Sequence, residues 1–251
     1  MTKNALSKTQ IDRLGDRLKK GLHAESDLRL LDDYRRSFGE AYEAVLRTIR
    51  QHGEFPTGRL SKSTNSIVEK LRRESIRLSQ MQDIAGCRVV VANIGQQDQF
   101  IASLKIDFIG AVIMDRRDKP SYDYRAVHVI VEIFGKPVEI QVRTSLQHLW
   151  AELSEKSSDV LDPTIKYGGG STEWRDFLTS SSEAIAADEE YEKSIAEIEE
   201  IVVELSELTE HHGSKHDVQL IRREQDERRE EVARLRNVIT DLLNKMISSL
   251  D

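Results

Sequence analysis

The chain has 251 residues, of which 38% are hydrophobic and 32% charged, so it is long enough for one packed domain with helical appendages. Its single cysteine, Cys87, excludes a disulfide framework and a multi-cysteine metal site. Its net charge of -7 argues against a protein that coats nucleic acid by bulk electrostatics. No apolar run approaches the ~20 residues of a membrane-spanning helix, so we expect a cytoplasmic protein with no membrane partner.

The N-terminal part of the chain is predicted to be helical. Apolar residues recur at helical spacing over residues 10–51, and Gly21 predicts a break between two helices. Pro56 then predicts a loop, and a further helix is expected over about 66–80.

Short runs rich in β-branched residues predict strands in the middle of the chain, at 88–92, 109–114, 127–134 and 138–142. Residues 135–137 are expected to be the turn of a hairpin between the last two strands. Alternation along the last strand puts Glu139, Gln141 and Arg143 on one face. A polar face so near the centre of a sheet is either solvated or the floor of an active site.

The rest of the chain is predicted to be helical, with a helix at 144–156, a flexible glycine loop at 167–171 and a helical hairpin broken at 211–214. The apolar stripes of the hairpin must be buried against each other, against the N-terminal helices or across a dimer axis. We therefore expect three parts: N-terminal helices at 1–54, a core at 55–171 and a C-terminal helical hairpin at 172–251.

The basic stretch around Lys62 is a candidate phosphate site. Lys62, Ser66 and Lys70 are four residues apart and would line one face of a helix. Ser66 near the start of that helix would cap it, beside free backbone N–H groups that attract phosphate. Considered alone, the stretch is more simply explained as a solvated basic face.

Two carboxylates could hold Mg²⁺ between the protein and a triphosphate. Asp83 stands just before a predicted strand, and Glu139 lies within another, flanked by apolar residues. An isolated aspartate there is usually a cap or turn residue, but a carboxylate inside an apolar strand needs a specific reason.

Tyr124 and His128 are expected to alternate onto one face of an extended strand. The tyrosine could stack on a base, and the histidine could bond to phosphate or ribose. The simpler alternative is ordinary aromatic packing at a strand edge.

Taken together, these segments resemble the RelA/SpoT synthetase family. Three of its motifs are matched in order, at residues 83–90 (DIAGCRVV), 124–128 (YRAVH) and 138–144 (VEIQVRT). The basic segment around Lys62 and the run QHLWAE at 147–152 extend the likeness over roughly 55–156, and so many linked motifs are improbable by chance.

The resemblance implies an α+β fold, a mixed β-sheet flanked by helices that is nucleotidyltransferase-like. It implies a small alarmone synthetase-like enzyme that uses Mg²⁺ and transfers pyrophosphate from ATP to the ribose 3′-hydroxyl of GDP or GTP. AMP would leave, and the product would be the alarmone (p)ppGpp.

The resemblance also assigns roles to individual residues. Asp83 would bind Mg²⁺, and Glu139 would bind Mg²⁺ or deprotonate the acceptor hydroxyl. The residues that would bind ATP are Arg59, Lys62, Ser66, Lys70 and Arg88. Those that would bind the acceptor are Tyr124, Arg125, His128, Gln141 and Arg143.

The chain departs from the family pattern at three positions. Asp123 stands where the family has glycine before the stacking tyrosine, and Ala126 replaces a serine, as it does in several small and toxic members. Arg59 stands one residue further from Lys62 than the family arginine. Transfer from ATP is therefore better supported than guanosine as the acceptor.

Three alternatives stay open from the sequence. A toxic member would modify either the 3′-CCA end of tRNA or an adenine nucleotide, and it would have an antitoxin as partner. Binding of tRNA would need a basic rim, which could be made by Arg116, Arg117, Lys119 and Arg125. A protein of another class would be an inactive regulatory module that binds a partner through its helices. By resemblance, terminal helices would also build a homo-oligomer.

Overall fold

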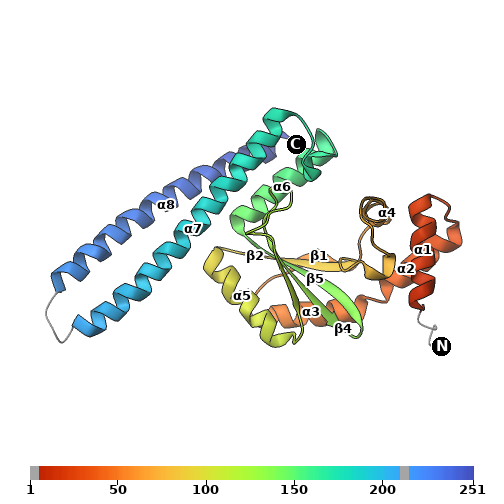
Figure 1. Ribbon diagram of the computed structural model, residues 1–251, viewed down its shortest axis with the longest axis horizontal. Coiled ribbons are helices and arrows are strands. Elements are labelled where there is room, and N and C mark those ends of the chain that lie inside the picture. Colours follow the sequence, from red (N-terminus) through yellow and green to blue (C-terminus); the bar gives the residue numbers. More distant parts are fainter. Residues whose placement is uncertain (1–5, 210–214) are drawn as a thin grey trace. The chain divides into compact units, whose positions relative to one another are not determined.

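The computed structural model describes residues 6–209 and 215–251, which form two compact units (Figure 1). Unit 1 contains the described residues up to Val89, together with Ile101–Met114 and Val127–Val142. Unit 2 contains Val90–Phe100, Asp115–Ala126 and the described residues from Arg143 onward. The expected division into three parts stays a prediction.

Three helices open unit 1, where the sequence predicted two. They are α1 (Lys8–Lys20), α2 (Glu25–Arg36) and α3 (Gly39–Gln51). The predicted break at Gly21 is confirmed, because this residue ends α1 with a left-handed φ of 70°. The second break, at Ser37 and Phe38, was missed because Tyr34, Phe38 and Tyr42 keep helical spacing across it and are all buried.

The next helix, α4 (Thr64–Arg73), is shorter than predicted. Ser63 caps it by accepting a hydrogen bond from the backbone N–H of Ser66 at 3.2 Å, so the prediction that Ser66 is the cap was wrong. After α4 the chain extends to the short 3₁₀ helix η1 (Leu78–Gln80). There Leu78 is fully buried against Gly15 of α1, where an added Cβ would lie 2.7 Å from the Leu78 Cβ atom.

A five-stranded sheet with the order β1-β2-β5-β4-β3 forms the centre of unit 1, and the predicted fold class, a mixed sheet flanked by helices, is confirmed. Its strands are β1 (Thr57–Arg59), β2 (Ala85–Val91), β3 (Val112–Asp115), β4 (Val127–Ile133) and β5 (Lys136–Thr144). Helix α3 packs on β4. The sequence analysis missed β1, and it missed helix α5 (Ile94–Asp107) between β2 and β3, where the polar Gln97 lies on the buried face and Ile106 is exposed.

The predicted hairpin of β4 and β5 is confirmed, with a different turn. Ile133 pairs with Lys136, so the two turn residues are Phe134 and Gly135, which have φ values of 52° and 67°. Two consecutive positive φ values are typical of a type I′ turn, whose twist matches that of the strands. Lys136 and Pro137 belong to β5, not to the turn. The predicted alternation along β5 is confirmed up to Val142.

The expectation that Tyr124 and His128 share a strand face was wrong. Strand β4 begins only at Val127, and Tyr124 closes a tight turn by donating its backbone N–H to Ser121 O at 3.2 Å. The sequence analysis missed this turn because Tyr122, which adopts a positive φ just before Asp123, is not a typical turn residue.

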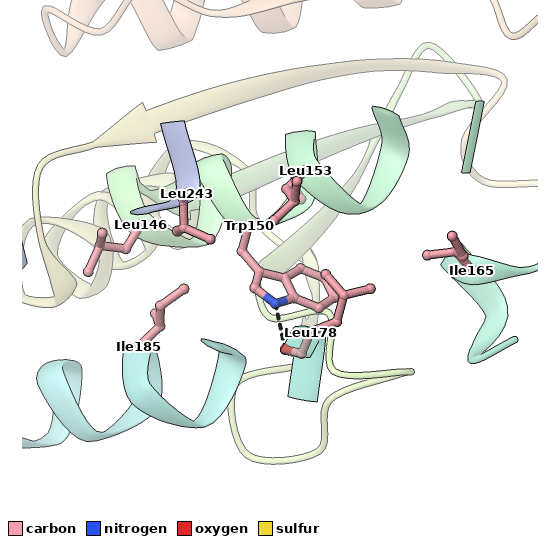
Figure 2. Close-up of a cluster of buried hydrophobic side chains, with 8 residues drawn as sticks. Leu146, Trp150, Leu153, Ile165, Leu178, Ile185 and Leu243 are labelled. Carbon is pink, nitrogen blue, oxygen red and sulfur yellow. Dashed lines mark hydrogen bonds between the residues drawn. The ribbon is translucent and has the colours of Figure 1, made fainter. Parts of the chain in front are cut away.

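Unit 2 is built around α6 (Ser145–Val160), the 3₁₀ helix η2 (Ile165–Tyr167), α7 (Thr172–Thr209) and α8 (Lys215–Ser249). The last two form the predicted helical hairpin and run antiparallel in Figure 1, while the expected break at 211–214 lies outside the described residues. Figure 2 shows the core, in which Trp150 of α6 donates its indole N–H to Leu178 O of α7 at 2.9 Å. Leu235 and Leu242 of α8 are exposed, whereas Leu243 is fully buried.

The glycine loop is compact where the structure describes it. Gly168 and Gly170 have φ values of 78° and 88°, and an added Cβ at Gly168 would lie 2.8 Å from the ring of Tyr122. Among the described residues, no helix is both long and apolar enough to span a bilayer.

Candidate active site

The residues predicted to form the site divide between the two units. Unit 1 holds those assigned to ATP and the metal, with two of the acceptor residues: Arg59, Lys62, Ser66, Lys70, Asp83, Arg88, His128, Glu139 and Gln141. Unit 2 holds the other three, Tyr124, Arg125 and Arg143.

In unit 1, Asp83 is held between two lysines. Its Oδ2 atom accepts a hydrogen bond from Lys62 Nζ at 2.8 Å, and its Oδ1 atom lies 3.0 Å from Lys70 Nζ of α4. The backbone N–H of Lys62 also donates to Ile84 O at 2.7 Å, which fixes the segment before α4 beside the start of β2. All three charged side chains are at most about one fifth exposed.

Burial raises the pKa of Asp83, but the charges and hydrogen bonds of Lys62 and Lys70 outweigh it, so the pKa lies below its ordinary value. The carboxylate is therefore ionised at neutral pH. The structure brings together two of the residues predicted for ATP and one predicted for the metal.

Glu139, the second carboxylate, lies on β5 and is held by two neighbours. His128 Nδ1 lies 2.8 Å from Oε1, and Gln141 donates its side-chain N–H to Oε2 at 2.9 Å. Gly86 of β2 faces this residue, since an added Cβ there would lie 3.1 Å from Glu139 O. The close approach of the two strands thus depends on a glycine in β2.

The pKa of Glu139 also lies below its ordinary value. Burial raises it, the hydrogen bond and charge of His128 lower it, the charge of Asp83 raises it, and Gln141 lowers it. The two carboxylates therefore interact electrostatically within unit 1. In the described residues, no group of three His, Cys, Asp or Glu side chains is gathered as a metal cage.

The remaining ATP residues of unit 1 lie on different elements. Ser66 is in the first turn of α4, and Arg59 is exposed on the edge strand β1, in register with Gly86. Arg88 is half-buried on β2. The assignment of Ser66, Arg59 and Arg88 to ATP therefore stays a prediction.

In unit 2, the side chains of Tyr124 and Arg143 pack together. Arg143 donates to the Tyr124 hydroxyl from Nε at 3.2 Å and from Nη2 at 3.0 Å, and its guanidinium carbon lies 5.0 Å from the ring centroid. Arg143 is buried, so the tyrosine is fixed by a cation–π contact and two hydrogen bonds.

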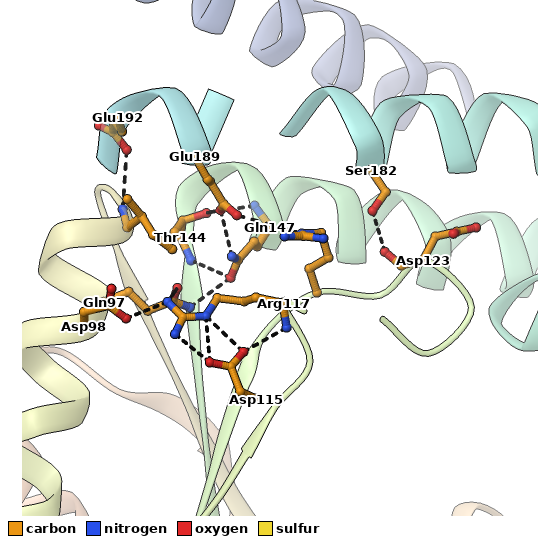
Figure 3. A network of polar contacts seen from close by, with 12 residues as sticks. Gln97, Asp98, Asp115, Arg117, Asp123, Thr144, Gln147, Ser182, Glu189 and Glu192 are labelled. Carbon is orange, nitrogen blue, oxygen red and sulfur yellow. Dashed lines mark hydrogen bonds and ion pairs between the residues drawn. The ribbon is translucent and has the colours of Figure 1, made fainter. Parts of the chain in front are cut away.

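Sequence reasoning missed a buried polar network in the same unit, shown in Figure 3. Glu189 of α7 accepts hydrogen bonds from Thr144 Oγ1 at 2.9 Å and from Gln147 Nε2 at 2.7 Å. Gln97 of α5 donates to Gln147 Oε1 at 2.9 Å. Burial raises the pKa of Glu189, and the hydrogen bonds and nearby arginines only partly offset it. Its position in a glutamate-rich helix gave no signal, whereas Gln147 lies in the QHLWAE run.

Known proteins resemble this chain in the region that carries the motifs named above. Residues 58–158 match the family model described as "Region found in RelA / SpoT proteins". This is the part of the chain in which the motifs predict a resemblance to the RelA/SpoT family.

Among solved structures, the small alarmone synthetase 1 of Bacillus subtilis bound to its product pppGpp is similar, with a TM-score of 0.50 and 26% identity over 69% of this chain and 97% of that one. A second structure of that enzyme matches with a TM-score of 0.50 and 27% identity over 70% of this chain and 100% of its own.

Curated relatives include uncharacterized proteins of Mycobacterium bovis and Mycobacterium tuberculosis, each 39% identical over 111 residues, or 43% of this chain. The match spans only 41% of the length of these relatives.

Proposed function

We propose that this protein transfers pyrophosphate from ATP to the ribose 3′-hydroxyl of GDP or GTP and so makes (p)ppGpp. The observation that carries the proposal is the pair of half-buried, ionised carboxylates in unit 1, Asp83 between Lys62 and Lys70, and Glu139 beside His128. They lie in or beside strands of a RelA/SpoT region whose fold resembles that of a small alarmone synthetase.

In the proposed reaction, the acceptor 3′-oxygen attacks the β-phosphorus of ATP. The bond between that phosphorus and the oxygen bridging to the α-phosphate breaks, and AMP leaves. The hydroxyl proton passes to Glu139, which is ionised because its pKa is lowered. Such a transfer needs little covalent help from the protein beyond orientation and charge.

The cations of unit 1 would bind the triphosphate. Lys62 and Lys70 would exchange their contacts with Asp83 for phosphate oxygens, with Ser66 in the first turn of α4, Arg59 and Arg88 adding donors. That exchange leaves the Asp83 carboxylate free to take a metal.

The donor set of unit 1 fits Mg²⁺. Asp83 and Glu139 offer carboxylate oxygens, the ligands that this ion prefers. The repulsion that raises the pKa of Glu139 would be offset by a cation shared with Asp83. When bound, Mg²⁺ supplies positive charge for the phosphates of ATP.

Tyr124, Arg125 and Arg143 of unit 2 are proposed to bind the acceptor nucleotide, a role that the resemblance also gives to His128 and Gln141. The state of Arg117 supports a nucleotide over tRNA. Its side chain is only 13% exposed, and its guanidinium lies 2.6 Å from the carboxylates of both Asp98 and Asp115. A charge neutralised in this way contributes little to a basic rim for RNA.

The test is incubation of the full chain with γ-labelled ATP, Mg²⁺ and one acceptor at a time: GDP, GTP, AMP, ATP or deacylated tRNA. We expect label on GDP and GTP and one AMP released for each transfer. Label on tRNA or an adenine nucleotide would establish the alternative acceptor, and an antitoxin partner would then be sought. No AMP with any acceptor would favour a binding module. Light scattering would test the expected homo-oligomer.

A further inference from the structure

The loop at 121–126, which carries Tyr124 and Arg125, adopts a conformation that its own sequence does not favour. Tyr122 and Asp123 have φ values of 53° and 64°, in the left-handed region that residues with a side chain rarely occupy. Such a backbone persists only where its surroundings hold it in place.

Helix α7 supplies two hydrogen bonds to this loop. Thr179 Oγ1 donates to Asp123 Oδ2 at 2.8 Å, and Ser182 Oγ donates to Asp123 O at 2.7 Å, as Figure 3 shows for Ser182. The Asp123 carboxylate is thus bound to the helix. The side chain and the backbone of Asp123 are therefore held by two hydroxyl groups that lie one turn apart on α7.

A third contact of α7 reaches Arg125. Its Nε atom lies 3.8 Å from Oε2 of Glu189, a buried carboxylate whose other oxygen accepts hydrogen bonds from Thr144 and Gln147. Glu189 follows Ser182 by seven residues, or two helical turns, so both lie on the same face of α7.

The glycine loop acts on the same segment from another side. Gly168 leaves space for the Tyr122 ring, because an added Cβ would lie 2.8 Å from Tyr122 Cδ1. Two separate parts of unit 2, α7 and the glycine loop, therefore contact the two strained residues.

We infer that α7 positions the loop at 121–126. Thr179, Ser182 and Glu189 hold Tyr124 and Arg125 of this loop in the arrangement that binds the acceptor nucleotide. This inference rests on the proposed function. It gives Asp123 a defined role, since a glycine there would reach the same φ unaided but could not bond to Thr179. The three α7 residues are positioning residues, because they act through the loop.

The first test uses hydrogen exchange at the loop, which needs no enzymatic activity. The Tyr124 amide is protected by its bond to Ser121 O. We expect the double variant Thr179→Val, Ser182→Ala to raise exchange at this amide at least about tenfold, equivalent to ~1.4 kcal/mol of lost local stability. The exposed Ser180→Ala on the same helix is the matched control.

Exchange of β5 amides serves as an internal control for folding, and Asp123→Ala provides a second variant that removes the Thr179 contact from the loop side. Unchanged exchange at Tyr124 in both variants would overturn the inference, whatever the activity.

The second test is kinetic. The double variant should raise the KM for the acceptor at least about fivefold and leave the KM for ATP within twofold, which a general loss of stability would not do. Glu189→Gln, which keeps an oxygen for Thr144 but removes the charge beside Arg125, should raise the acceptor KM without changing exchange at Tyr124. Faster exchange with an unchanged acceptor KM would refute the positioning role. Faster exchange in a protein that transfers pyrophosphate to no acceptor would instead refute the proposed function.

Discussion

Replacing Glu139 by glutamine tests the chemical step most directly. Glutamine has nearly the same size and keeps an oxygen for His128 Nδ1, which now lies 2.8 Å from the carboxylate. Gln141 can turn its amide to keep its own contact, so the fold should tolerate the change. The variant loses only the charge and the ability to accept a proton.

The expected loss is at least ~10²-fold in kcat, the usual scale of a general base, or about 2.7 kcal/mol of transition-state stabilisation. The assay is AMP release at saturating ATP and GDP over a range of pH. The acidic limb of the wild-type profile, which reports protonation of this carboxylate, should disappear in the variant.

Glu132→Gln is the matched control, because this glutamate is exposed on the other strand of the same hairpin. It should leave kcat within twofold. Near wild-type turnover by Glu139→Gln at an unchanged Mg²⁺ requirement would refute the base and metal roles together. A normal kcat with a raised Mg²⁺ requirement would leave only the metal role.

Three further predictions follow from unit 1. Replacing Lys62 or Lys70 by methionine should raise the KM for ATP at least about tenfold, measured at saturating acceptor, because each removes a charge-assisted phosphate contact. Asp83 and Glu139 have lowered pKa values, so their contribution to stability is present at neutral pH and is lost as the pH falls through those pKa values. The melting temperature of Asp83→Asn should therefore change less than that of the wild type between about pH 5 and pH 2. Gly58→Ala should destabilise the protein by about 1–3 kcal/mol in urea unfolding, since the added Cβ would lie 2.6 Å from a backbone oxygen of β2, and an unchanged midpoint would contradict this.

The strand pattern around Glu139 could be predicted because alternation is a local property. Buried Val138, Ile140 and Val142 alternate with more polar residues, so sequence alone predicts the two faces of β5. Only the family resemblance could predict that Asp83 and Lys62 lie close together, since 21 residues separate them and no local rule brings them together.

Other features depend on contacts between distant segments and leave no local pattern. The left-handed backbone of Tyr122 and Asp123 is stabilised by residues of α7 more than fifty positions later. Glu189 is one glutamate among many in α7, and only the fold distinguishes it as the buried partner of Thr144. Tertiary contacts outweigh local preference at these positions.

The charges of unit 1 suggest why Asp83 is placed between two lysines. Buried cations without a partner cost several kcal/mol, so a site that awaits a polyanion needs an internal anion to hold its lysines in place. Asp83 provides it, with contacts of 2.8 and 3.0 Å to Lys62 and Lys70. If triphosphate binds these lysines as proposed, the carboxylate would lose its counter-charges and gain affinity for a cation. Binding of ATP and of Mg²⁺ would then be coupled through this one side chain, and by thermodynamic linkage each ligand would raise the affinity for the other by the same factor.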